Sequence, residues 1–154
     1  MNQIDIQRIL SELTGLPNYD THIGLQCVPG TNDAFGATRV KREGDLIVPA
    51  EHNEEDFKEF VFDFPYTNNV LEKLQVFRAR VMKLHPKTCY TYHKDSTKRL
   101  HIPLVTNDKC FFVCEDQVER YPADGNFFIL DTTKMHTFVN ASKVERLHIV
   151  ACIK

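Results

Sequence analysis

Three groups in the second half of the chain could together hold a metal ion and an organic acid: the motif His93-Lys94-Asp95, the distal His136, and Arg146. Residues two apart on a β-strand point to the same face, so His93 and Asp95 can bind one metal ion. His136 on a neighbouring strand would complete a triad of two histidines and one carboxylate. Such a triad leaves three positions of an octahedral metal open, which suits iron(II) chemistry with oxygen.

The histidine-x-acid pattern alone is not specific. Seven histidines and 21 acidic residues in 154 positions give about one match by chance, and His52-Asn53-Glu54 is a second match. This second motif sits in an acidic, loop-like stretch, where solvent exposure or a helix start is the simpler interpretation. With His93 as its distal histidine, the position ten residues further on is Pro103, whereas Arg146 follows His136 at that spacing. The pattern therefore favours the first motif.

The ten-residue spacing between His136 and Arg146 has a structural interpretation. Segments 135–139 and 145–153 predict a hairpin closed around residues 140–144, which would place both side chains on paired strands facing one cavity. A guanidinium can hold a carboxylate through two parallel hydrogen bonds. 2-Oxoglutarate needs such an anchor, because its 2-oxo acid end chelates the metal and its far carboxylate requires a cation. The sequence therefore predicts that Arg146 binds that far carboxylate.

Alternation along the predicted strands places more cationic or imidazole side chains on shared faces. These pairs are Arg99 and His101 in 99–105, Arg78 and Arg80 in 76–84, and Arg146 and His148 in 146–152. If the opposite, apolar faces pack on helices, the cations turn inward and form a basic cavity for a dianionic co-substrate and an acidic substrate. The alternative is that some of these side chains face solvent.

The elements that must position these residues fall into two parts. Residues 3–14 predict a helix that ends before Gly15, and Asn68 or Asn69 is expected to cap a second short helix ending near Leu74. From residue 75 onward, short β-type segments separated by turn residues follow one another: 76–84, 88–93, 99–105, 110–114, 117–120, 126–131, 135–139 and 145–153. This pattern predicts an antiparallel sandwich or barrel with the helices against one outer face.

Length and composition indicate the number of domains, the expected partners and location, and the state of the cysteines. A length of 154 residues suits one domain, 1–154, with helices and strands in 1–75 and the core barrel in 76–154. A net charge of −2 gives no indication that the protein as a whole binds nucleic acid or a membrane surface. No signal-peptide core or membrane-length apolar run is visible, so a cytoplasmic location is expected. Five cysteines predict reduced thiols, with Cys110 and Cys114 in a buried strand rather than in a zinc site.

The stretch 80–150 resembles the aspartyl/asparaginyl β-hydroxylase-like group of 2-oxoglutarate oxygenases, and is similar also to bacterial free-proline hydroxylases. Its sequence is especially similar to small members encoded by cyanobacterial phages, which implies a bacterial or phage-infected host cell. The matching segments are Tyr-His-Lys-Asp at 92–95, Arg-Leu-His-Ile-Pro-Leu at 99–104, Asp131 to Thr137, Asn140, and Arg-Leu-His-Ile-Val at 146–150.

This resemblance implies a mainly β, double-stranded β-helix (cupin-like jelly-roll) fold and a hydroxylase that uses iron(II), 2-oxoglutarate and O2 and releases succinate and CO2. Vertebrate members have glycine two residues after the first histidine, so the carboxylate at Asp95 resembles the bacterial type more closely. Two sets of site residues are implied: His93, Asp95 and His136 as iron ligands, and Arg146, Arg99 and His101 as co-substrate contacts.

Two other function classes stay open at this point. A cupin with another metal, acting as an isomerase or lyase, needs the triad but no arginine ten residues beyond it. A non-catalytic binding module would keep the barrel without a metal. For an oxygenase, the substrate could be a free amino acid, a peptide side chain or a nucleotide-linked group, and the oligomeric state is also open.

Overall fold

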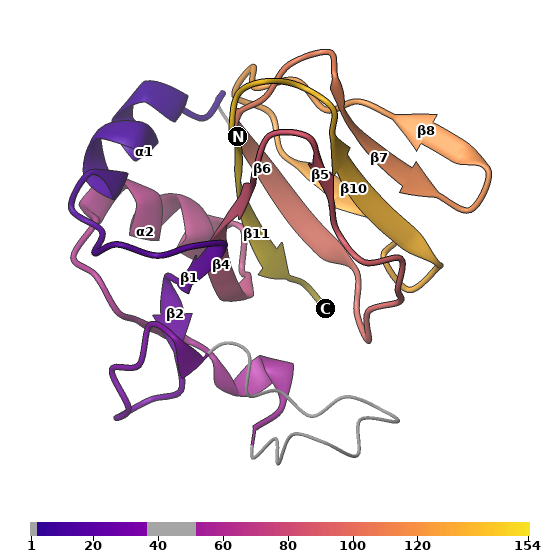
Figure 1. The fold of residues 1–154 in the computed structure, drawn as a ribbon. Coiled ribbons are helices and arrows are strands. Elements are labelled where there is room, and N and C mark those ends of the chain that lie inside the picture. Colours follow the sequence, from indigo (N-terminus) through magenta and orange to yellow (C-terminus); the bar gives the residue numbers. More distant parts are fainter. Residues whose placement is uncertain (1–2, 37–51) are drawn as a thin grey trace.

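The computed structural model describes residues 3–36 and 52–154. Its core is two antiparallel sheets that face one another, with two helices beside the larger sheet (Figure 1). The larger sheet contains, in spatial order, β1 (His22–Gly24), β4 (Phe77–Leu84), β11 (Arg146–Cys152), β6 (Arg99–Val105) and β9 (Phe128–Leu130). The smaller sheet contains β5 (Thr88–Cys89), β10 (His136–Asn140), β7 (Cys110–Cys114) and β8 (Gln117–Glu119). The predicted cupin-like jelly roll is confirmed.

The N-terminal part adds five further elements. These are α1 (Ile6–Leu13), the strand pair β2 (Gln26–Cys27) and β3 (Glu59–Phe60), the 3-10 turn η2 (Glu54–Asp56), and α2 (Pro65–Lys73). Both α-helices lie on the outer face of the larger sheet, away from the smaller sheet (Figure 1). The prediction that helices cover one outer face of the barrel is therefore confirmed.

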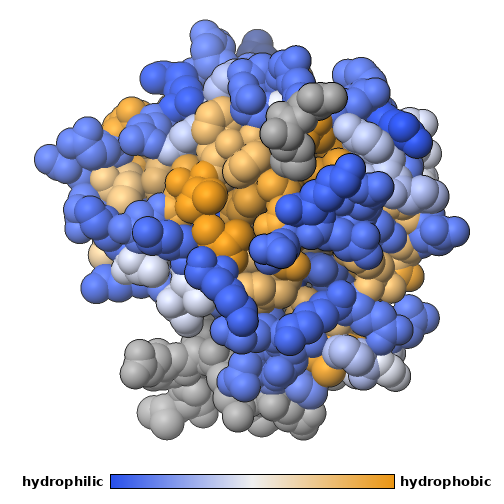
Figure 2. All heavy atoms as spheres, turned by 180° about the vertical axis from the view of Figure 1, so that it is seen from behind, coloured by the Kyte–Doolittle hydropathy of each residue, from blue (hydrophilic) through white to orange (hydrophobic). Residues whose placement is uncertain are grey.

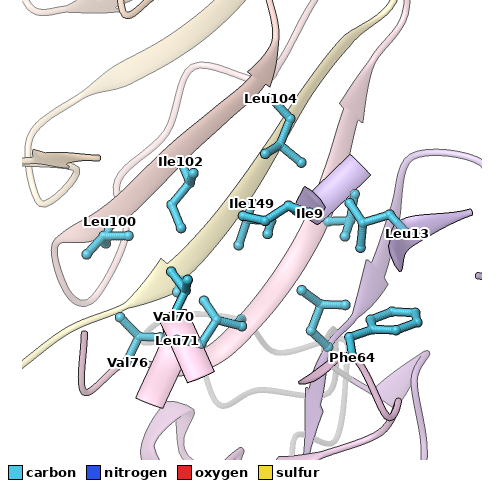
Figure 3. Close-up of a cluster of buried hydrophobic side chains, with 14 of the residues drawn as sticks. Ile9, Leu13, Phe64, Val70, Leu71, Val76, Leu100, Ile102, Leu104 and Ile149 are labelled. Carbon is cyan, nitrogen blue, oxygen red and sulfur yellow. The ribbon is translucent and has the colours of Figure 1, made fainter. Parts of the chain in front are cut away.

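The helices are held there by apolar side chains from alternate positions of the sheet. Ile9 and Leu71 are fully buried, and they pack in one cluster with Ile102 and Ile149 (Figure 3). Each such side chain contributes about 1.5–3 kcal/mol by leaving water. Because the outward positions of β6 and β11 are occupied by this core, their intervening polar residues must point to the other face, toward the smaller sheet.

The start of α2 differs from the prediction. The helix begins at Pro65, so the expected caps Asn68 and Asn69 lie inside it. The free amides of its first turn are instead bound by the Glu12 carboxylate of α1, which accepts hydrogen bonds from the backbone N–H groups of Tyr66 at 2.9 Å and Thr67 at 2.8 Å. Proline suits the first helical position because it has no N–H to leave unpaired. A partner distant in sequence has replaced a local cap.

The predicted hairpin between residues 135–139 and 145–153 is wrong. β10 pairs with β5 and β7, whereas β11 pairs with β4 and β6. The connection after Asn140 therefore crosses from the smaller sheet to the larger one, as jelly-roll topology requires. His136 and Arg146 consequently lie on opposite sheets.

Asn140 stabilises this crossing. Its side-chain NH2 donates to the carbonyl oxygens of Leu84 at 2.8 Å and Val144 at 2.9 Å. Its side-chain oxygen accepts hydrogen bonds from the Ser142 hydroxyl at 2.7 Å and the Cys110 thiol at 3.3 Å. Since Leu84 belongs to the larger sheet and Cys110 to the smaller one, this buried amide fastens the two sheets together at one end.

The described residues contain no helix that is both long and apolar enough to cross a membrane.

On the back of the molecule, hydrophobic residues gather near the centre of the face with hydrophilic residues around them (Figure 2).

We expect Asn140→Ala to lower the free energy of unfolding by about 3 kcal/mol, because it leaves several buried polar groups without partners at about 1–3 kcal/mol each. Urea denaturation followed by circular dichroism measures this change. Asn126→Ala is the matched control: its side chain is exposed, and a change within about 0.5 kcal/mol is expected. Equal effects of the two substitutions would contradict the role given to Asn140.

Candidate metal and co-substrate site

A cavity of about 580 Å³ lies between the two sheets. The larger sheet contributes its inward side chains, the smaller sheet contributes β10, and the loop between β5 and β6 closes one side. The charged and histidine side chains in its lining are Glu54, Arg78, Arg80, Lys83, His93, Lys94, Asp95, Arg99, His101, His136 and Arg146. All six predicted site residues therefore line one cavity.

His93, Asp95 and His136 converge within this cavity. One ligand-competent atom of each lies within 4.8 Å of the others. The Nε2 atom of His93 is 3.8 Å from Asp95 Oδ1, and the Nε2 atom of His136 is 3.7 Å from Asp95 Oδ2. Nitrogen and oxygen ligands bind zinc at about 2.0–2.2 Å, so two ligands of one such ion lie at most about 4.4 Å apart. Both distances are short enough for a shared ion.

Backbone hydrogen bonds bring the triad together, although His93 does not lie in a continuous strand. β5 ends at Cys89, earlier than the predicted 88–93. His93 nevertheless forms an isolated bridge with His136, in which each N–H donates to the other carbonyl oxygen at 3.0 and 2.9 Å. The Asp95 amide donates to the carbonyl oxygen of Thr132 at 2.8 Å. These backbone hydrogen bonds fix all three residues relative to one another.

Hydrogen bonds also set the tautomer of both histidines. The Nδ1 atom of His93 lies 2.7 Å from the Thr91 carbonyl oxygen, and that of His136 lies 2.9 Å from the Lys134 carbonyl oxygen. A carbonyl oxygen can only accept, so each Nδ1 carries the proton and each Nε2 presents its lone pair to the triad. Burial lowers the pKa of His136, which favours the neutral, ligand-competent imidazole. The donor set and its orientation fit a metal ion.

The carboxylate of the triad is held by Arg99. The Arg99 Nη2 atom lies 3.0 Å from Asp95 Oδ1 and 2.6 Å from Glu54 Oε1. Glu54 also pairs with Arg78 at 2.7 Å and accepts a hydrogen bond from the Thr97 hydroxyl at 2.8 Å. Burial acts to raise the pKa of Glu54, but the Arg99 and Arg78 charges and the Thr97 hydrogen bond outweigh it and lower the pKa.

Glu54 is the site residue that the sequence analysis missed. It belongs to the competing motif His52-Asn53-Glu54, but its carboxylate is taken up by two guanidiniums, and His52 is absent from the cavity lining. In the described ranges, the triad of His93, Asp95 and His136 is the one group of metal-competent side chains that converges. One feature of the sequence could have pointed to Glu54: an arginine predicted to face the cavity, such as Arg99, calls for an acidic partner, and Glu54 supplies one.

Arg146 has a different environment from Arg99. It is buried, and within the part of the chain that the structure describes no carboxylate pairs with it. Its guanidinium carbon lies 4.5 Å from the centre of the Phe138 ring, and its Nη2 atom donates to His148 Nδ1 at 2.7 Å. Burial lowers the pKa of Arg146 to about 9. A bound anion would therefore stabilise the charged guanidinium.

His101 lies beside Arg146 and also faces the cavity. Its ring centre is 4.9 Å from that of Phe138, and its Nδ1 atom lies 3.4 Å from His148 Nδ1. Burial, and then the Arg146 charge, lower the pKa of His101 well below its ordinary value, so the imidazole is neutral. Its Nε2 atom is buried and has no hydrogen-bond partner among the residues described. An unsatisfied buried nitrogen in a cavity is suited to contact a polar ligand.

The family of this chain is decided by its sequence. Residues 40–154, well over half of the chain, match the sequence model of the aspartyl/asparaginyl beta-hydroxylase family. The chain belongs to this family. The resemblance inferred from the triad and its flanking residues is confirmed at the level of the family. No curated protein matches the chain.

Several solved structures resemble part of this family member. The plu4264 protein from Photorhabdus luminescens is 14% identical with a TM-score of 0.43, covering 49% of this chain and 61% of its own. A cupin domain from Bordetella pertussis is 15% identical with a TM-score of 0.44, covering 50% of this chain and 80% of its own. A predicted oxalate decarboxylase from Thermotoga maritima is 17% identical with a TM-score of 0.42, covering 54% and 72%.

The triad predicts a stabilising response to metal. With Mn(II) at about 100 times its dissociation constant, the free energy of unfolding should rise by about 2.7 kcal/mol. His136→Ala should abolish this rise, because it removes one of three ligands. Thermal unfolding under anaerobic conditions, with and without Mn(II), measures the response. His52→Ala is the control and should respond like the wild type; a lost response in that variant would favour the competing motif.

Glu54→Gln should lower the free energy of unfolding by about 3–5 kcal/mol at pH 7, because it removes a buried carboxylate that neutralises charge on two buried arginines. The folded pKa of Glu54 is lowered from its ordinary value of 4.5. Its contribution is therefore complete above about pH 4.5 and is lost as the pH falls through the lowered folded pKa. The difference between wild type and variant should shrink in that acidic range.

Urea denaturation across pH 3–7 measures both effects, within the range where each protein folds. Glu55→Gln is the control on the same turn, since the Glu55 side chain is 58% exposed and pairs with Lys154 at the surface. A loss no larger for Glu54→Gln than for Glu55→Gln would contradict the proposed ion-pair network.

Proposed function

We propose that this protein is an iron(II)- and 2-oxoglutarate-dependent dioxygenase that hydroxylates an amino acid, free or within a peptide, and releases succinate and CO2. One observation carries the proposal: a triad with two Nε2 lone pairs and one carboxylate shares a cavity with Arg146, a buried cation that has no acidic partner among the described residues. Membership of the aspartyl/asparaginyl beta-hydroxylase family supports the same reaction class.

In this proposal His93, Asp95 and His136 hold iron(II), which when bound supplies the oxidising chemistry with O2. The two histidine Nδ1–H groups, tied to backbone carbonyl oxygens, keep the rings oriented. Arg99 keeps the Asp95 carboxylate in place through its contact with Oδ1. The residues around the triad thus limit movement of the ligands and bury His136 away from bulk water.

The two predicted arginine contacts to 2-oxoglutarate separate into different roles. Arg146 is suited to the far carboxylate, because it is buried and can donate two parallel hydrogen bonds. The charge of Arg99 is already shared between Glu54 and Asp95, so we assign it chiefly to positioning Asp95. His101, which lines the cavity and whose Nε2 atom has no partner among the described residues, is suited to contact the co-substrate between the triad and Arg146.

The environment of Arg146 favours an oxygenase over a metal-dependent isomerase or lyase. Those reactions need the triad but no buried cation beside it. Burial of a guanidinium without a carboxylate is costly, and a dicarboxylate co-substrate would offset that cost at every turnover. A non-catalytic module would leave the converging side chains of His93, Asp95 and His136 without a role.

Purified protein supplied anaerobically with Fe(II) and then with O2 should convert 2-oxoglutarate to succinate, measured by liquid chromatography and mass spectrometry. Arg146→Gln should weaken 2-oxoglutarate binding by about 2–4 kcal/mol, because a buried charge pair loses one partner. Isothermal titration of 2-oxoglutarate into the Mn(II)-loaded protein measures that affinity.

Arg120→Gln is the matched control, because Arg120 is exposed and lies outside the cavity lining. Its affinity for 2-oxoglutarate should equal that of the wild type. Metal binding without any binding of 2-oxoglutarate would sink the oxygenase proposal and leave the isomerase or lyase class.

A further inference from the structure

Arg80 is a second arginine in the cavity lining, and the proposed reaction gives it no role. It projects from β4 into the cavity, and no carboxylate in residues 3–36 or 52–154 pairs with it. Its Nε atom is buried and has no hydrogen-bond partner. Burial, and then the neighbouring Arg78 charge, lower the pKa of Arg80 to about 10. Arg80 thus resembles Arg146 in lining the cavity without a carboxylate partner among the described residues, although its side chain is only partly buried.

The two arginines lie at different ends of the cavity. In the pairing of β4 with β11, Arg80 is opposite Val150 and Arg146 is opposite Leu84. Four residues along a strand therefore separate their positions, which is roughly 13 Å at about 3.3 Å per residue. Arg80 lies level with His101, because Val150 pairs with Arg80 on one side and with His101 on the other. Arg146 reaches His101 from further along the strand, through His148, which contacts both side chains.

One molecule of 2-oxoglutarate has no carboxylate left for Arg80 once its 2-oxo acid end is at the triad and its far carboxylate is at Arg146. Its two carboxylate carbons are joined through four C–C bonds of about 1.5 Å each, so they lie at most about 6 Å apart, well short of the roughly 13 Å between the two backbone positions. Its ten non-hydrogen atoms occupy at most about 300 Å³ at the roughly 30 Å³ that a water molecule takes up. The cavity measures about 580 Å³, which leaves space for a second small group.

We propose that Arg80 binds an oxyanion of the substrate, a carboxylate or a phosphate, at the end of the cavity away from Arg146. This inference rests on the proposed function, because it assigns Arg146 to the co-substrate. Arg80 lies on the side of the triad, because Val150 pairs with both Arg80 and His101, and Arg99, two residues before His101 on the same strand, contacts Asp95. A substrate anchored there would place its neighbouring carbon atoms near the metal ligands.

The test uses binding rather than turnover. Wild-type protein is loaded with Mn(II) and 2-oxoglutarate without oxygen, and probes are titrated by calorimetry. The probes are two matched acid and amide pairs together with inorganic phosphate: L-alanine with L-alaninamide, which differ in the α-carboxylate, and L-aspartate with L-asparagine, which differ in the side-chain carboxylate. We expect at least one acid to bind about tenfold or more tightly than its amide partner, or phosphate to bind, because an oxyanion accepts charge-assisted hydrogen bonds from a guanidinium.

Arg80→Gln should abolish this preference and leave 2-oxoglutarate binding within about twofold of the wild type, while Arg80→Lys should restore part of the preference. Arg120→Gln, the same change on the surface, should alter neither property. A preference for acids over phosphate identifies a carboxylate substrate, and the reverse identifies a phosphorylated one.

Three results would overturn the assignment: no anionic probe binds the wild-type complex, the preference persists in Arg80→Gln, or Arg80→Gln weakens 2-oxoglutarate binding as much as Arg146→Gln does. The last result would make Arg80 part of the co-substrate site. Failure of the wild type to bind 2-oxoglutarate at all would instead contradict the proposed function, so the two failures are distinguishable. Thermal unfolding of each variant confirms that it is folded before titration.

Discussion

A charged guanidinium buried in a protein requires a compensating anion, and this cavity contains more arginines than carboxylates. Arg78, Arg80, Arg99 and Arg146 line it, whereas among the described residues Glu54 and Asp95 are its acidic side chains. Glu54 and Asp95 are both engaged by arginine at one end. A metal ion at the triad would add further positive charge. The fold therefore creates a cavity with an excess of positive charge that favours bound anions, and this excess underlies the roles proposed for Arg146 and Arg80.

The alternation of residue types along single strands was enough to predict which side chains enter the cavity. In β6 and β11 the apolar residues pack under the helices, so Arg99, His101 and Arg146 face inward as predicted. Strand pairing could not be predicted in the same way. Alternation defines the two faces of a strand but carries no information about its neighbour. The short segment between β10 and β11 is compatible with a hairpin, and it instead crosses between sheets. The prediction that His136 and Arg146 face one cavity still holds, because the two sheets that carry them face that cavity from opposite sides.

Interactions between distant segments account for the other differences from the sequence prediction. The first turn of α2 is capped by Glu12 of another helix, so the local search for a cap among Asn68 and Asn69 failed. Glu54 lies in an acidic stretch whose pattern resembles a solvated turn, and only the tertiary structure brings it to Arg78 and Arg99. In both cases a carboxylate far away in sequence satisfies groups that would otherwise remain unpaired. Such partners are invisible to periodicity, because they depend on how the elements pack.

The N-terminal part is therefore more than a cover for the barrel. The 3-10 turn that contains Glu54 contributes to the cavity wall, and through Arg99 it acts on the carboxylate of the triad. Arg99 contacts Asp95 Oδ1, while Oδ2 faces His136 Nε2. An oxygen already engaged by a guanidinium is less available to a metal ion, so this contact favours ligation through one oxygen. Ligation of that kind preserves three open positions, and a 2-oxo acid together with O2 would need all of them. The ion pairs that begin at Glu54 would thus bear directly on the number of ligands that a metal ion at the triad could accept.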